Sequence, residues 1–150
     1  MGVDPSEDGI NQAQLRKENR KAGPELHLGN AYDDLAASYG RFPCVVSLEV
    51  VEHVYFPRKY AKCVRGLLEP GGMAIISTPY HGYWKNLALA LTGKFDEHFT
   101  ALWDHGHIKF WSVRTLSMLF EEQGLQVEKV IRVGRFPTLA KSMILVIRRK

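Results

Sequence analysis

Residues 44–54, which read CVVSLEVVEHV, decide how the rest of the sequence is interpreted. Residues 44–48 are an apolar run with β-branched members, which is typical of a strand buried on both faces of a parallel sheet. Glu49, Glu52 and His53 follow directly, and all three can bind ligands. Ligands bind in the crevice beyond the carboxyl ends of parallel strands, so we expect a functional site in residues 49–54.

The segment that follows predicts a second parallel strand. Pro57 opens a helix, because the missing N–H of proline costs little at the first helical position. Residues 69–72 (EPGG) end this helix, and residues 73–77 are the next apolar strand. Strand, helix and strand in this order form a βαβ unit, so the two strands are expected to run parallel. One helix face carries apolar residues at a helical period: Tyr60, Val64, Leu67 and Leu68.

The C-terminal part predicts a different ending to the sheet. Ser112 is a favourable N-cap for a helix that runs to Gln123, with Gly124 closing it. Residues 127–133 and 143–148 are two further strands. The loop between them is too short for a crossover helix, so we expect an antiparallel pair. The predicted fold class is therefore α/β, a mostly parallel sheet that ends in an antiparallel strand pair.

The remaining segments are shorter or less regular. Val3-Asp4 looks like the end of a strand, and a polar helix follows from Pro5-Ser6 to about Lys21. Residues 26–29 predict a short strand, and residues 32–39 a short helix. Residues 78–108 are long, aromatic-rich and irregular, with one helix expected around residues 84–91.

Composition limits the class of protein. The 150 residues are 45% hydrophobic and 24% charged, as in a single soluble domain. No apolar run reaches the roughly 18–20 residues of a membrane-spanning helix, and no secretory signal is evident, so we expect a cytoplasmic protein without stable membrane insertion. The net charge of +4 is spread along the chain, which argues against a nucleic-acid site. Cys44 and Cys63 are expected to be reduced, buried thiols.

These motifs together resemble the class I S-adenosylmethionine-dependent methyltransferases, a Rossmann-like family whose sheet ends in an antiparallel pair. Residues 46–54 (VSLEVVEHV) are similar to the segment after the fourth strand in the ubiquinone-biosynthesis O-methyltransferases and their small-molecule relatives. Residues 68–72 (LEPGG) resemble the next family motif, and residues 107–112 (HIKFWS) the opening of the last long helix. The resemblance covers nearly the whole chain and implies a single domain over residues 1–150, with residues 79–111 covering the substrate pocket.

The resemblance also has a gap. The first strand and glycine-rich cofactor loop of the family should precede Val3, and the sequence contains neither. That strand is central in the family sheet, and its absence would expose two strand edges. Three interpretations stay open: a fragment that lacks an N-terminal segment, a partner chain that completes the sheet, or a decayed gene product.

The resemblance implies a set of site residues. Asp4 would accept hydrogen bonds from both ribose hydroxyls of the cofactor, Asn30 and Ala31 would meet the adenine, and Leu48 would contact the cofactor through its backbone. The family usually has Asp at the position of Asn30. In the ubiquinone O-methyltransferases, the residues matching Glu49, Glu52 and His53 are associated with a divalent metal, and this donor set suits Mg²⁺, Mn²⁺ or Zn²⁺. The alternative is that Glu52 and His53 shape the loop or cap the next helix.

The expected function is methyl transfer from S-adenosylmethionine to a small-molecule acceptor, with an oxygen as the favoured target. His53 is the preferred general base among the candidate histidines, which also include His81, His98, His105 and His107. The alternative function is a catalytically inactive, methyltransferase-like partner or scaffold. A nicotinamide-dependent dehydrogenase fragment would share the acidic residue after the second strand, but it does not account for residues 49–54 or the antiparallel ending.

Overall fold

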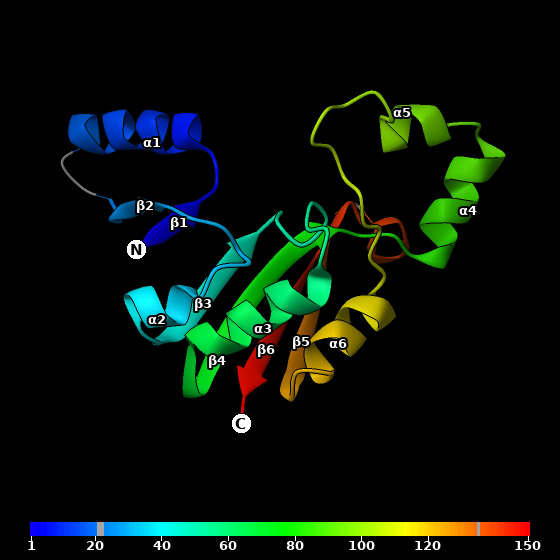
Figure 1. Cartoon of the computed structure of the whole chain (residues 1–150). Helices are drawn as coiled ribbons and strands as arrows, with labels where there is room; N and C mark the ends of the chain where they lie inside the picture. Colours follow the sequence, from blue (N-terminus) through cyan, green and yellow to red (C-terminus); the bar gives the residue numbers. More distant parts are fainter. Residues whose placement is uncertain (21–22, 135) are drawn as a thin grey trace.

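The computed structural model describes residues 1–20, 23–134 and 136–150. Its strands form two separate sheets (Figure 1). One is a short parallel pair, β1-β2, and the other has four strands in the order β3-β4-β6-β5. The elements in chain order are β1 Gly2–Asp4, α1 Glu7–Arg20, β2 Leu26–Leu28, α2 Leu35–Tyr39, β3 Phe42–Leu48, α3 Pro57–Leu67, β4 Leu68–Pro79, α4 Tyr83–Leu91, α5 Phe95–Phe99, α6 Val113–Glu121, β5 Leu125–Val133, η1 Pro137–Leu139 and β6 Ser142–Arg149.

The four-stranded sheet confirms the predicted mixture of directions. β3 and β4 pair in parallel, because α3 returns the chain to the same end of the sheet. β6 is antiparallel to both β4 and β5, as the short connection between β5 and β6 requires. The carboxyl ends of β3 and β4, which precede residues 49 and 80, therefore lie at the same end of the sheet.

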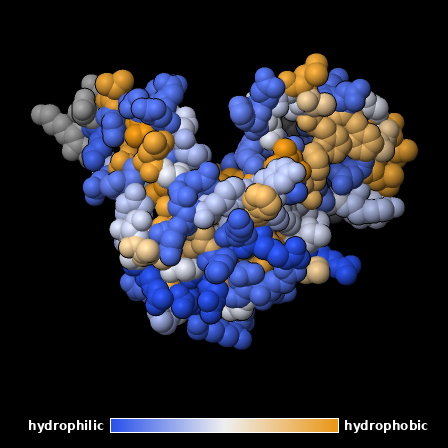
Figure 2. Space-filling view, viewed as in Figure 1, coloured by the Kyte–Doolittle hydropathy of each residue, from blue (hydrophilic) through white to orange (hydrophobic). Residues whose placement is uncertain are grey.

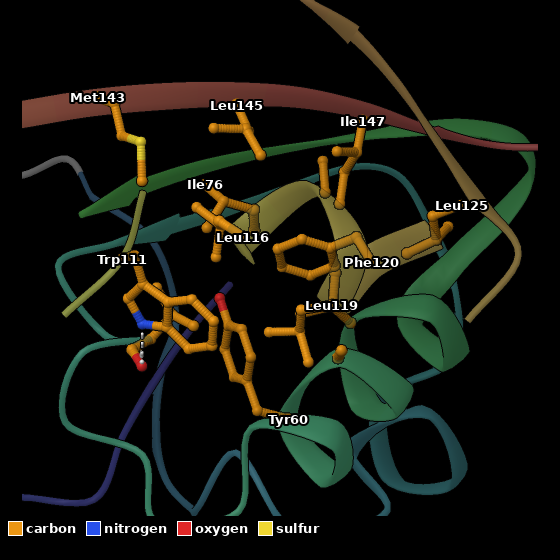
Figure 3. Packing of buried hydrophobic residues seen from close by; sticks show 14 of the residues in the cluster. Tyr60, Ile76, Trp111, Leu116, Leu119, Phe120, Leu125, Met143, Leu145 and Ile147 are labelled. Carbon is orange, nitrogen blue, oxygen red and sulfur yellow. Dashed lines mark hydrogen bonds between the residues drawn. The ribbon is translucent and has the colours of Figure 1, made fainter. Parts of the chain in front are cut away.

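The hydrophobic core lies between this sheet and the two helices α3 and α6 (Figure 3). Phe120, Leu145 and Ile147 are completely buried there. The ring centroids of Tyr60 and Phe120 lie 6.2 Å apart in an edge-on arrangement. The predicted N-cap of α6 is confirmed, since the Ser112 hydroxyl accepts a hydrogen bond from the N–H of Thr115. The apolar faces of α3 and α6 thus pack on the sheet, and the loops that carry the site residues are attached to this packed core.

The N-terminal unit consists of β1, α1 and β2. Ser6 caps α1, because its Oγ accepts a hydrogen bond from the N–H of Gly9 at 3.0 Å. The predicted end of this helix at Lys21 lies outside the described residues. The helix predicted over residues 32–39 begins only at Leu35, since Asn30 holds a turn by accepting from the N–H of Tyr32 at 3.0 Å.

The prediction that β3 is buried on both faces is wrong. Val46 and Leu48 are 57% and 61% exposed, and Cys44 is exposed as well. The physical reason is that β3 pairs with β4 on one side only, so it is an edge strand of the four-stranded sheet. The division between the two sheets falls where the resemblance places the absent strand. Both cysteines are free, as expected, but neither is buried.

Residues 79–111 form a lobe that follows the carboxyl end of β4, with α4 as predicted and α5 in addition. Figure 2 shows hydrophobic side chains gathered on this lobe, and a hollow between it and the N-terminal unit. Tyr83, Trp84 and Leu91 are strongly exposed on α4. None of the helices in the described part of the chain is long and apolar enough to cross a membrane.

Candidate functional site

Two loops that are distant in sequence meet beyond the ends of β3 and β4. The carbonyl oxygen of Glu52 accepts hydrogen bonds from the N–H groups of Ile108 and Lys109, at 2.9 and 3.0 Å. The indole Nε1 of Trp111 donates to the carbonyl oxygen of Val51 at 3.0 Å (Figure 3). These bonds hold residues 105–111 against residues 51–54, so the side chains of both segments share one site.

The Glu52 carboxyl group is the buried centre of this site. Only 1% of the residue is exposed, and the Thr78 hydroxyl donates a 3.0 Å hydrogen bond to Oε2. The other oxygen, Oε1, is buried without a hydrogen-bond partner among the described residues. Burial raises the pKa of Glu52, because desolvation disfavours the carboxylate. A buried acceptor without a donor indicates a place for a proton, a water molecule or a cation.

His53 is oriented by backbone carbonyls. Its Nδ1 lies 3.0 Å from the carbonyl oxygen of His105 and 3.2 Å from that of Gly106. A carbonyl oxygen can only accept, so Nδ1 carries the proton and the Nε2 lone pair stays free. The His53 side chain can therefore act as a base or as a metal ligand through Nε2.

His107 completes the cluster. Its ring centroid lies 4.8 Å from that of His53, and its Nε2 lies 3.9 Å from Oε1 of Glu52. Burial lowers the pKa of His107, which favours the neutral imidazole. At 3.9 Å the two atoms are too far apart for a hydrogen bond, so neither is paired with the other.

Glu52, His53 and His107 could hold one metal ion. One ligand atom from each residue lies within 4.8 Å of the others. Ligands around one divalent cation, at about 2.0–2.6 Å from it, are separated by up to about 5 Å, so the group fits with small adjustments. The set differs in one member from the predicted Glu49, Glu52 and His53. The sequence placed His107 only among the candidate general bases, and its one metal-binding signal was its spacing from Asp104 and His105.

Glu49 is hydrogen-bonded to β4 and is not among the three grouped residues, although its charge still acts on Glu52 and His107. Its φ is 53°, a left-handed conformation that is uncommon outside glycine. Its Oε1 accepts a 2.7 Å hydrogen bond from the Ser77 hydroxyl, while its N–H donates to the Ser77 carbonyl oxygen at 3.1 Å. The side chain is therefore fastened to β4 and is not part of the three-residue group.

The residues predicted to hold the cofactor lie around a cavity that extends to the loop of the cluster, since Leu48 and Val50 are among its lining residues. A cavity of about 510 Å³ lies between the N-terminal unit and β3, and Asp4, Ala31 and Leu48 line it. This volume is in the range of small-molecule sites. Asn30 is not among the lining residues. Asp4 accepts a hydrogen bond from the N–H of Ser6 at 2.8 Å through Oδ1, and the residue is exposed.

The other histidines lie apart from the cluster, except for the contact of the His105 carbonyl with His53. His81 packs among His98, Phe99 and Phe110, with ring centroids 5.1–5.9 Å away. Burial, together with the nearby positive charge of Lys85, lowers the pKa of His81 to about 4. His81 is therefore neutral at physiological pH and contributes to packing below the α4–α5 lobe.

The sheet order and this site together define a class I methyltransferase fold, and comparison with solved structures agrees. A Pyrococcus horikoshii protein superposes with a TM-score of 0.73 at 21% identity, covering 99% of this chain and 70% of that one. The magnesium protoporphyrin IX methyltransferase of Synechocystis, solved with bound SAH, gives a TM-score of 0.68 at 16% identity and covers 99% of this chain and 63% of that one. The chain belongs to the Methyltransferase domain family, whose profile matches residues 1–130.

Curated relatives are more similar to this chain in sequence than these solved structures are. The chain is 31% identical over 131 residues to the ubiquinone biosynthesis O-methyltransferase of Dinoroseobacter shibae, covering 84% of this chain and 50% of the relative. It is 30% identical over 140 residues to the mitochondrial ubiquinone biosynthesis O-methyltransferase of Homo sapiens, covering 87% of this chain and 36% of the relative. The chain thus spans half or less of the length of these relatives.

Proposed function

We propose that the chain binds S-adenosylmethionine beside Asp4, Asn30, Ala31 and Leu48 and supports methyl transfer to a hydroxyl group of a small aromatic molecule. The observation that carries the proposal is the cavity lined by Asp4, Ala31 and Leu48, which lie at or just after the ends of β1, β2 and β3. The names of the curated relatives support an oxygen acceptor of the quinol or phenol type. No interaction with nucleic acid is proposed.

The protein residues have limited tasks in such a reaction. S-adenosylmethionine supplies a methyl group that is already electrophilic, so the chain must orient the acceptor and remove its proton. The Nε2 atom of His53 can take that proton, because Nδ1 is held as a donor by the carbonyls of His105 and Gly106. Trp103 lies edge-on to His53 at 6.2 Å and offers an apolar surface for a flat acceptor.

A divalent cation at Glu52, His53 and His107 is the second way to activate the acceptor. Two imidazoles and one carboxylate suit Zn²⁺ or Mn²⁺ better than Mg²⁺, which prefers oxygen ligands. The cation would bind the acceptor hydroxyl and lower its pKa. It would also give the unpaired Oε1 of Glu52 a partner. His53 cannot be base and ligand through Nε2 at the same time, so the two variants of the mechanism exclude each other.

The test of the cofactor assignment is the substitution Asp4→Ala. Loss of hydrogen bonds to a carboxylate costs about 1.5–3 kcal/mol, so the Kd for S-adenosylhomocysteine should rise about 10- to 100-fold in calorimetry. Asp8→Ala is the matched control, because Asp8 lies in the first turn of α1 and accepts only from Gln12 among its side-chain contacts. Equal affinity of the wild type and the Asp4 variant would refute the assignment. No binding by the wild type would favour the inactive scaffold.

Glu52→Gln should separate cation binding from folding. The pKa of Glu52 is raised in the folded chain, so its contribution to stability is full below the unfolded pKa and is lost as the pH rises through the folded value. With chelator at pH 8, the variant should therefore melt higher than the wild type, and this difference should disappear as the pH is lowered below the unfolded pKa of a carboxyl group. Added Zn²⁺ or Mn²⁺ should raise the Tm of the wild type and not that of the variant.

Glu49→Gln is the control for this experiment, since Glu49 is exposed and bonded to Ser77. Its Tm with chelator should match the wild type, and the gain with Zn²⁺ should be retained. An equal gain with Zn²⁺ in the Glu52 variant would remove Glu52 from the ligand set.

A further inference from the structure

Two neighbouring hydroxyl groups at the carboxyl end of β4 each bind a different carboxylate. The Ser77 hydroxyl donates to Oε1 of Glu49 at 2.7 Å, and the Thr78 hydroxyl donates to Oε2 of Glu52 at 3.0 Å. Successive side chains of a strand point to opposite faces of its sheet, so the two hydroxyl groups lie on opposite sides of β4. The end of β4 therefore directs the two carboxylates that follow β3 to different places.

The contact between Thr78 and Glu52 is enclosed by protein, since Thr78 is 0% exposed and Glu52 is 1% exposed. The backbones of the two residues are held differently. Thr78 pairs with Met143 in the ladder between β4 and β6, whereas Glu52 lies in the turn after β3. A β-branched side chain such as threonine also has few rotamers. The sheet therefore fixes the position of the hydroxyl donor, and the donor fixes the carboxylate.

The hydrogen bond gives the two oxygen atoms of Glu52 different surroundings. Oε2 is bound by Thr78, whereas Oε1 has no hydrogen-bond partner among the described residues and lies 3.9 Å from Nε2 of His107. The terminal torsion of a glutamate is broad, so it does not set the plane of the carboxylate by itself. With Oε2 held by Thr78, the plane is set and Oε1 stays on the side of His107.

We propose that Thr78 is a positioning residue of the group formed by Glu52, His53 and His107. Its hydroxyl holds one oxygen atom of Glu52, so that the other is presented to a divalent cation between the carboxylate and the two imidazoles. Residues that orient a metal ligand through a hydrogen bond contribute to metal affinity although they do not touch the metal. The inference rests on the cation variant of the proposed function and adds a residue of β4 to that site.

The test compares two substitutions that differ in the hydroxyl group. Thr78→Val keeps the branched shape and removes the donor, whereas Thr78→Ser keeps the donor and removes a methyl group. For Thr78→Val, the Kd for Mn²⁺ and Zn²⁺, measured by calorimetry, should rise about 10- to 100-fold. Thr78→Ser should bind both ions as the wild type does. A role in packing alone would not be rescued by serine, because serine fills less space than valine.

Ser77→Ala is the matched control. It removes the neighbouring hydroxyl group, which binds Glu49, and leaves the contact between Thr78 and Glu52 intact. Its affinity for Mn²⁺ should not fall. Circular dichroism with chelator checks that each variant is folded. If Thr78→Val does not fold, Thr78→Ala and Thr78→Ser provide the same comparison, because they differ by one oxygen atom.

Several results would overturn the proposal while the cation site itself stands. Equal Kd values for the wild type and Thr78→Val would show that the hydroxyl does not position Glu52. Binding by Thr78→Ser that is as weak as by Thr78→Val would assign the effect to side-chain shape, and an equal loss in Ser77→Ala would assign it to a general disturbance of β4. If the wild type binds neither ion, the cation variant of the proposed function fails, and this inference fails with it.

Discussion

Replacing Phe120 with Ala is expected to lower the free energy of unfolding by about 3–5 kcal/mol. Phe120 is completely buried between α6 and the sheet, and its ring meets Tyr60 edge-on at 6.2 Å (Figure 3). The substitution removes the apolar surface of the ring and leaves a cavity that Leu145 and Ile147 cannot fill without moving strands. Urea unfolding followed by circular dichroism measures the change.

Met118→Ala on the same helix is the matched control. Met118 is 48% exposed, so its loss should change stability by no more than about 0.5 kcal/mol. A change below about 1 kcal/mol for the Phe120 variant would contradict the packing of α6 against the sheet. An equal effect of both substitutions would indicate a general loss of helix propensity instead of a lost core contact.

Much of the scaffold could be predicted because its signals are local. Pro57 begins α3, and the side chains of Tyr60 and Val64 are buried as their helical spacing predicted. Ser112 caps α6 through its own hydroxyl, and the short link after β5 forces the antiparallel pair. Each of these features depends on residues that are close in sequence, so a reading of the sequence reaches it without knowledge of the tertiary contacts.

The parts that escaped prediction depend on distant contacts. An apolar run such as residues 44–48 fits a strand with two neighbours, but the number of neighbours is a property of the whole sheet, and β3 has one. His107 joins Glu52 because hydrogen bonds to the carbonyl oxygens of Val51 and Glu52 hold residues 105–111 against that loop. Glu49 is outside the group, and its carboxylate accepts a hydrogen bond from Ser77, a residue 28 positions later that no local pattern connects with it.

His53→Asn should reduce methyl transfer to 3,4-dihydroxybenzoate, a catechol, by about 100- to 10,000-fold in kcat, the range for loss of a general base. The asparagine amide can still donate to the carbonyl oxygens that now bind Nδ1, so the loop between His105 and Ile108 should keep its position. Only the free Nε2 lone pair is lost. A radiolabelled methyl group counts the product.

His105→Asn is the control, because His105 contributes its carbonyl oxygen to His53, and its own φ of 60° is one that asparagine tolerates well. Its rate should stay within about threefold of the wild type. A chelator then decides between the two roles of Nε2: if His53 is the base, removal of metal leaves the rate unchanged, and if it is a ligand, the rate falls and Mn²⁺ or Zn²⁺ restores it. An unaltered rate in the His53 variant would exclude both roles. Each role needs the lone pair of Nε2, and the asparagine side chain has no atom at that position.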